Sequence, residues 1–140
     1  MLLIDSVVRN DETGLWVFAH LSADSLFVTD DGISSVIGLE FLAQTAAALF
    51  TLQSTNPPVA VRQGMLIACS RLDADLPWFA VEDGLLVHVQ PASRMPTADQ
   101  GRGLVKFVGD IHIIPRGAPL PTVLPIRERG VVRAEWSVYL

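Results

Sequence analysis

The sequence of 140 residues has a formal net charge of −5 at pH 7; 50% of its residues are hydrophobic and 18% are charged. This composition excludes a disordered chain and predicts a single globular domain, residues 1–140, with a substantial core. The acidic balance, without any cluster of Lys and Arg, argues against nucleic-acid binding.

The compartment can also be predicted from the sequence. The single cysteine, Cys69, excludes an internal disulfide framework and fits a reducing environment. It lies in the apolar run 65–69, where a small buried hydrophobe is expected. Asp5 interrupts the N-terminal apolar run, so no signal peptide is predicted. We therefore expect a soluble cytoplasmic protein that does not span a membrane.

Short segments precede the longest predicted element. A turn at residues 10–14 leads into 15–22, where apolar residues alternate well enough to predict a strand. His20 shares one face of this strand with Trp16, so it could be buried. Residues 24–32 then form a loop that leads to the next element.

Residues 35–53 predict one long helix, which ends before the prolines in 56–58. The segment is rich in Ala, Leu and Phe and is apolar on nearly every side, a pattern typical of a buried helix. Glu40 is its only charged residue and lies on the same narrow stripe as Gln44. Burial there would raise the pKa of Glu40 and favour the protonated acid, which makes it a candidate general acid.

The rest of the chain predicts strands at 61–72, 84–90, 104–114 and 131–140, while four prolines and two glycines exclude a central strand along 115–130. The last strand alternates between one dry and one wet face, as in an antiparallel sheet that covers a core on one side. Together these patterns predict an α+β fold, in which a curved antiparallel sheet of about five or six strands wraps one long central helix.

Three motifs resemble the hot-dog-fold 3-hydroxyacyl-ACP dehydratases. The run Gly38-Leu-Glu-Phe-Leu-Ala-Gln44 is similar to the start of their central helix, and Met1-Leu-Leu-Ile-Asp5 is similar to their opening. Residues 24–27 occupy the place of the segment before their active-site loop. The resemblance extends over most of the chain, and the nearest branch is the one associated with aryl polyene biosynthesis.

This resemblance implies a hot-dog fold and the loss of water from a 3-hydroxyacyl thioester carried on acyl carrier protein or coenzyme A. It also implies a homodimer or a higher assembly of dimers, with a second hot-dog subunit as a possible partner. Glu40 would act on the departing hydroxyl, and Gln44 would orient it. Ile37, Gly38 and Phe41 would contact the substrate, with backbone N–H groups near the helix start polarising the thioester oxygen.

The catalytic histidine of the family has no counterpart in this sequence. Residues 29–35 lack it where the better-known dehydratases carry it, and the Pro-His pair of related branches would precede Met1. Three explanations are open: the base has been lost, the reading frame begins upstream, or another histidine has replaced it. His20 is the first candidate for replacement, whereas His88 and His112 are expected to be solvated or structural.

Two other functions are compatible with the predicted fold. A non-catalytic hot-dog protein could bind an acyl chain or serve as partner of an active dehydratase, and a hot-dog thioesterase would use a carboxylate to activate water. The sequence contains no metal-ligand spacing and no glycine-rich phosphate loop, so neither a metal nor another cofactor is expected.

Overall fold

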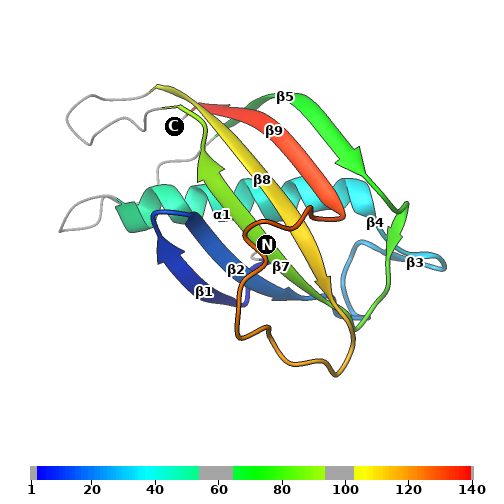
Figure 1. Cartoon of the computed structure of the whole chain (residues 1–140). Helices are drawn as coiled ribbons and strands as arrows, with labels where there is room; N and C mark the ends of the chain where they lie inside the picture. Colours follow the sequence, from blue (N-terminus) through cyan, green and yellow to red (C-terminus); the bar gives the residue numbers. More distant parts are fainter. Residues whose placement is uncertain (1–2, 54–64, 94–102, 140) are drawn as a thin grey trace.

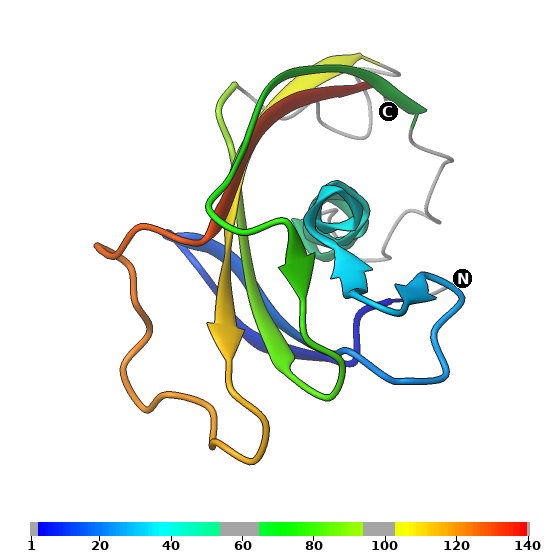
Figure 2. The same ribbon diagram turned by 90° about the vertical axis from the view of Figure 1, so that its right-hand side faces the viewer.

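The computed structural model describes residues 3–53, 65–93 and 103–139, and it consists of one long helix lying across the concave side of a curved sheet (Figures 1 and 2). The elements, in chain order, are β1 (Ser6–Asp11), β2 (Gly14–His20), β3 (Val28–Thr29), β4 (Gly32–Ser34), the 3-10 turn η1 (Ser35–Ile37), α1 (Gly38–Gln53), β5 (Met65–Ala74), β6 (Trp78–Phe79), β7 (Gly84–Pro91), β8 (Leu104–Ile114) and β9 (Val132–Tyr139).

The main sheet has six antiparallel strands in the order β1-β2-β7-β8-β9-β5, and the short strands β3, β4 and β6 form a second sheet. This arrangement confirms the predicted hot-dog architecture. Sequence patterns missed β3, β4 and β6, because strands of two or three residues are too short to show an alternation. They also missed β1, since no strand was predicted before residue 15. Cys69 was predicted to be buried, which is wrong: β5 is an edge strand, and the cysteine is exposed on it.

The core lies between α1 and the concave face of the sheet. Alternate residues of each strand point inward, and the helix contributes Leu42, Ala46 and Leu49, all buried. The prediction of a helix buried on all sides is wrong for the single chain, because Val36 and Leu52 are 62% and 49% exposed. The segment Ser35–Leu52 is apolar and long enough to cross a membrane by composition alone; 39% of it is buried in this fold.

Gly109 of β8 lies where the helix packs tightly on the sheet. A Cβ atom at this position would lie 2.6 Å from the carbonyl oxygen of His88 and 2.8 Å from Cδ2 of Leu42. It would also lie 3.0 Å from the ring of Trp136 on β9. Only a residue without a side chain therefore lets α1 settle this close to the sheet.

The convex face of the sheet is covered in part, which differs from the wet face predicted from alternation. Residues 115–131 cross this face, and Leu124 of that segment packs against Trp16, Leu86 and Ile114 in a second apolar cluster. His88, expected to be solvated or structural, is 9% exposed beneath this cover.

Asp110 holds the covered region together. Its Oδ2 accepts hydrogen bonds from Nε2 of His112 at 3.1 Å and from the backbone N–H of Gly130 at 3.2 Å, and its Oδ1 lies 3.4 Å from Nδ1 of His88. Burial raises the pKa of Asp110, but the hydrogen bonds from the two histidines outweigh it and lower the pKa to about 2.

We expect Gly109→Ala to lower the free energy of unfolding by about 1–3 kcal/mol, because the added methyl group forces backbone or core side chains apart. Urea denaturation of the purified protein measures the change. Gly103→Ala is the matched control, since a Cβ there meets no described atom within 4 Å. Equal effects of the two substitutions would contradict the close packing at Gly109.

The lowered pKa of Asp110 predicts a loss of stability in acid. A carboxyl group whose pKa falls from 3.8 to about 2 on folding stabilises the protein above pH 4, and this contribution disappears as the pH drops towards 2. At about 1.4 kcal/mol per pKa unit, the contribution is about 2 kcal/mol. We therefore expect the stability difference between the wild type and Asp110→Asn to shrink by that amount between pH 5 and pH 2. A difference that stays constant over this range would contradict the prediction.

Candidate active site at the start of the central helix

The two polar residues at the start of α1 form a hydrogen-bonded pair. Nε2 of Gln44 donates to Oε1 of Glu40 at 3.1 Å, one helical turn apart, as the predicted stripe requires. The prediction that Glu40 is buried is wrong for the single chain: its side chain is exposed, because it projects from the side of α1 opposite the buried Leu42 and Leu49. The carboxylate therefore depends on something other than its own sheet to exclude water.

The N-terminal segment runs beside this pair. The backbone N–H of Leu3 donates to Oε1 of Gln44 at 2.8 Å. A cavity of about 190 Å³ lies beside this hydrogen bond. It is lined by Leu3, Phe27, Ile37, Glu40 and Gln44. The structure thus brings together three of the sequence-predicted site residues, which are Ile37, Glu40 and Gln44.

A second cavity of about 220 Å³ lies next to the first. Leu3 and Phe27 line both cavities, so these two side chains separate them. The predicted residues His20 and Phe41 line the second cavity and not the first. Gly38 lines neither; a Cβ atom there would lie 3.0 Å from Cδ1 of Ile111, so this glycine lets the helix start lie close to β8.

His20 lies at the end of β2 and is exposed, which differs from the burial considered from its alternation with Trp16. Its Nε2 lies 3.0 Å from Oε2 of Glu82, and its backbone N–H donates to Asp5. Glu82 has the uncommon φ of +69°, and its Oε1 also accepts from the backbone N–H of Ala23. The carboxylate of Glu82 therefore holds the ring of His20, and His20 does not line the cavity that contains Glu40.

Sequence reasoning gave no site role to Leu3 or Phe27, which close the Glu40 cavity on the side away from the helix. Both lie in motifs on which the family resemblance rests, residues 1–5 and 24–27. The position of these motifs could therefore have indicated that the two residues lie at the site. In the described parts of the chain, no group of three or more His, Cys, Asp or Glu side chains is placed to hold a metal ion.

A long helix across a curved antiparallel sheet defines a hot-dog fold, and in this chain an acid and an amide are paired in the first turns of that helix. The sequence model of the family described as ApeP-like, ApeP dehydratase, matches residues 1–117. The chain therefore belongs to the ApeP-like dehydratase family.

The fold has a close counterpart among solved structures. A chain from the dehydratase heterocomplex ApeI:P of Xenorhabdus doucetiae superimposes with a TM-score of 0.75 at 15% sequence identity, covering 99% of this chain and 82% of that chain. At this level of identity the likeness shows a shared fold. Among curated proteins, none matches the sequence.

We expect Gln44→Met to release the N-terminal segment, because the N–H of Leu3 loses its acceptor while the side chain keeps its length. Loss of one hydrogen bond costs about 1 kcal/mol, so the amide of Leu3 should exchange with solvent several times faster. Hydrogen exchange followed by NMR measures this. Glu40→Gln, which leaves the Leu3–Gln44 bond in place, is the control; unchanged exchange in Gln44→Met would contradict the prediction.

Proposed function

We propose that this chain is the subunit of a dehydratase that removes water from a 3-hydroxyacyl thioester, carried on acyl carrier protein or coenzyme A. The observation that carries the proposal is the Glu40–Gln44 pair in a cavity at the helix start, in a member of the ApeP-like dehydratase family. Glu40 acts on the hydroxyl group that departs from C3 of the substrate.

The elimination needs two groups. A base takes the proton from C2, the C2–C3 double bond forms as the C3–O bond breaks, and an acid protonates the departing hydroxyl so that it leaves as water. Glu40 suits the second role, because its carboxyl group faces the cavity while Gln44 holds one of its oxygens by hydrogen bonding. The aliphatic and aromatic walls supplied by Leu3, Phe27 and Ile37 suit an acyl chain.

A second hot-dog subunit completes the site in this proposal. Glu40 lies on the side of the helix that its own sheet leaves open, and two apolar side chains of the helical segment, Val36 before it and Leu52 at the far end, are also exposed. A partner subunit laid over this side would bury the apolar surface and exclude water from the carboxylate, which strengthens its electrostatic interactions. The solved structure that shares the fold comes from a heterocomplex, which supports a partner of a different sequence.

The second candidate function is a non-catalytic partner subunit that binds the acyl chain. It is favoured by one observation: among the described residues that line the Glu40 cavity there is no histidine. In the dehydratase proposal the base must therefore come from outside this set, for instance from the partner. In the alternative, the partner carries the complete machinery and Glu40 takes no part.

Glu40→Gln separates the two. The assay is hydration of a 2-enoyl thioester of acyl carrier protein, by the chain alone and by the chain together with a second hot-dog subunit that forms a stable complex with it. Loss of the acid should lower the rate by about 100-fold or more, since general acid catalysis contributes that much. Glu12→Gln, in the exposed turn between β1 and β2, is the control. A complex that stays fully active with Glu40→Gln would reject the dehydratase role and support the partner role.

A further inference from the structure

A larger cavity lies on the convex side of the sheet, on the face opposite α1. It has a volume of about 450 Å³ and lies between the ends of β7 and β8 and the segment 115–131, which crosses that face in Figure 1. Its lining is aliphatic and rich in proline, with Leu86, Ile114, Pro119 and Val123 among the members, and it includes two titratable residues, His112 and Glu128. The cavity is partly open to solvent, since Val123 is 82% exposed, and its volume leaves room for an aliphatic ligand.

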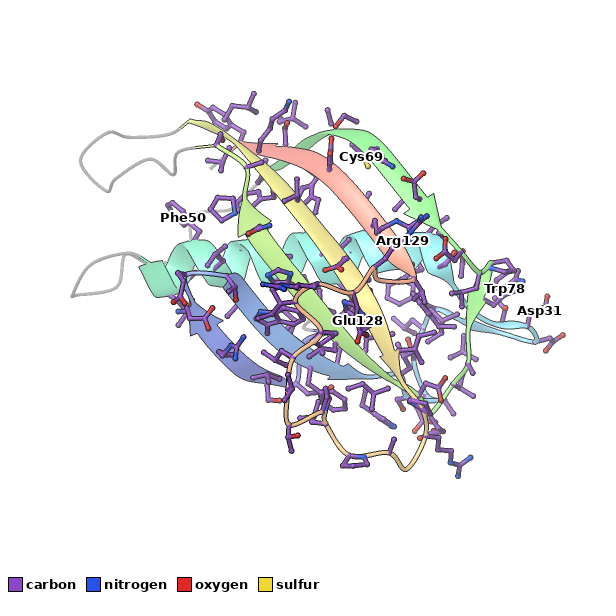
Figure 3. All side chains as sticks on the ribbon, in the orientation of Figure 1. Asp31, Phe50, Cys69, Trp78, Glu128 and Arg129 are labelled. Atoms are coloured by element: carbon purple, nitrogen blue, oxygen red, sulfur yellow. The ribbon has the colours of Figure 1, made fainter. Side chains whose placement is uncertain are left out.

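The walls of this outer-face cavity are anchored on both sides. At the start of the segment, the N–H of Arg116 donates to Oδ1 of Asp83 at 2.9 Å; at its end, Gly130 donates to Asp110. Between these anchors, Leu124 is 8% exposed in its cluster with Trp16. Figure 3 shows Glu128 on the part of the segment that passes over the sheet. The cavity is thus already formed in the free protein, which lowers the entropic cost of binding.

The hydrogen bond to Asp110 fixes which nitrogen of the His112 ring carries a proton. Nε2 of His112 contacts the ionised carboxylate of Asp110, which can only accept, so Nε2 carries the proton. In the neutral ring Nδ1 is then an acceptor. Among the described residues no hydrogen-bond partner for this nitrogen is found, and the ring lines the cavity. The neutral form of His112, a lining residue, thus has a ring nitrogen with a lone pair and no described partner.

His88 stands behind Asp110 and takes no part in the lining. Its Nε2 donates to the carbonyl oxygen of Thr13, its Nδ1 lies near Asp110, and its ring stacks on Trp16 with centroids 3.9 Å apart at an interplanar angle of 9°. His88 and Gly130 therefore hold the Asp110 carboxylate on the sheet side of His112, so that the ring is oriented before any ligand arrives.

The polar groups of the cavity define the ligand. His112 Nδ1 and the carboxylate of Glu128 both accept hydrogen bonds, Glu128 is negative, and no Lys or Arg lies among the lining residues that are described. We propose that the outer-face cavity binds an aliphatic primary ammonium compound. The ammonium group donates to His112 and pairs with Glu128, and the alkyl chain lies along the aliphatic and proline side chains.

The probe is n-hexylammonium chloride, titrated into the whole protein at neutral pH and followed by nitrogen NMR of the histidine rings. The sequence has three histidines, so single substitutions assign every signal. We expect a saturable shift at Nδ1 of His112 and none at His20. Hexanoate and n-hexanol have the same chain length, and we expect each to bind at least tenfold more weakly.

Variants test the two contacts separately. Glu128→Gln and His112→Gln should each weaken hexylammonium binding about tenfold, whereas Glu12→Gln should leave it unchanged. Urea denaturation of each variant shows whether it is folded, and Glu128→Gln, at an exposed position, keeps the test valid if His112→Gln unfolds. Binding of hexanoate as tight as that of hexylammonium, no saturable shift, or full binding by Glu128→Gln would each overturn the proposal.

Discussion

The close packing of α1 against β8 at Gly109 is the constraint on which the candidate active site depends. The absence of a side chain at this position leaves the space that Leu42 of α1 and the ring of Trp136 occupy against the strand. Leu42 and Leu49 of α1 are buried against the sheet. Because the helix has about 3.6 residues per turn, Glu40 and Gln44 then lie on the side of α1 that the sheet does not cover. The position of the acid therefore follows from the packing of residues that take no part in the chemistry.

An acid on the open side of the helix has consequences for how the site is built. The sheet cannot cover it, so the walls come from the N-terminal segment and from the loop before the helix, through Leu3 and Phe27. The hydrogen bond from Leu3 to Gln44 joins the first of these walls to the helix. A site with such walls stays open to the outside of the chain, whereas an acid under the sheet would be buried.

The architecture could be predicted from the sequence because its periodicities are long and regular. The apolar helix 35–53 and the alternating strands that follow it leave few arrangements besides a wrapped helix. Burial could not be predicted in the same way. A helix that is apolar all round does not reveal which side its own chain covers, so Glu40 was expected inside and is exposed. His20 alternates with Trp16 and Phe18 on one face of its strand, a pattern that suggested burial. It is exposed because it is the last residue of β2.

The cover over the convex face of the sheet could not be predicted, for a different reason. Asp110 and His112 alternate as solvent-facing residues do, and the pattern carries no information about a segment that folds back from residues 115–131. Such a cover is possible here because the buried carboxylate is paired: two histidines and one backbone N–H offset the cost of removing it from water. A proline-rich segment suits the role, since it loses less conformational entropy than other chains when it is fixed.

The helix that carries Glu40 and the segment that forms the outer-face cavity both pack on strand β8. Successive residues of β8 point to opposite faces, so Gly109 receives the helix while Asp110 anchors the outer segment. Gly109 packs against the carbonyl of His88, whose ring contacts Asp110. Asp110, which anchors the outer segment, therefore lies one residue along the backbone from the glycine against which α1 packs. The strand pair β7–β8 thus supports the helix on its concave side and the outer segment on its convex side.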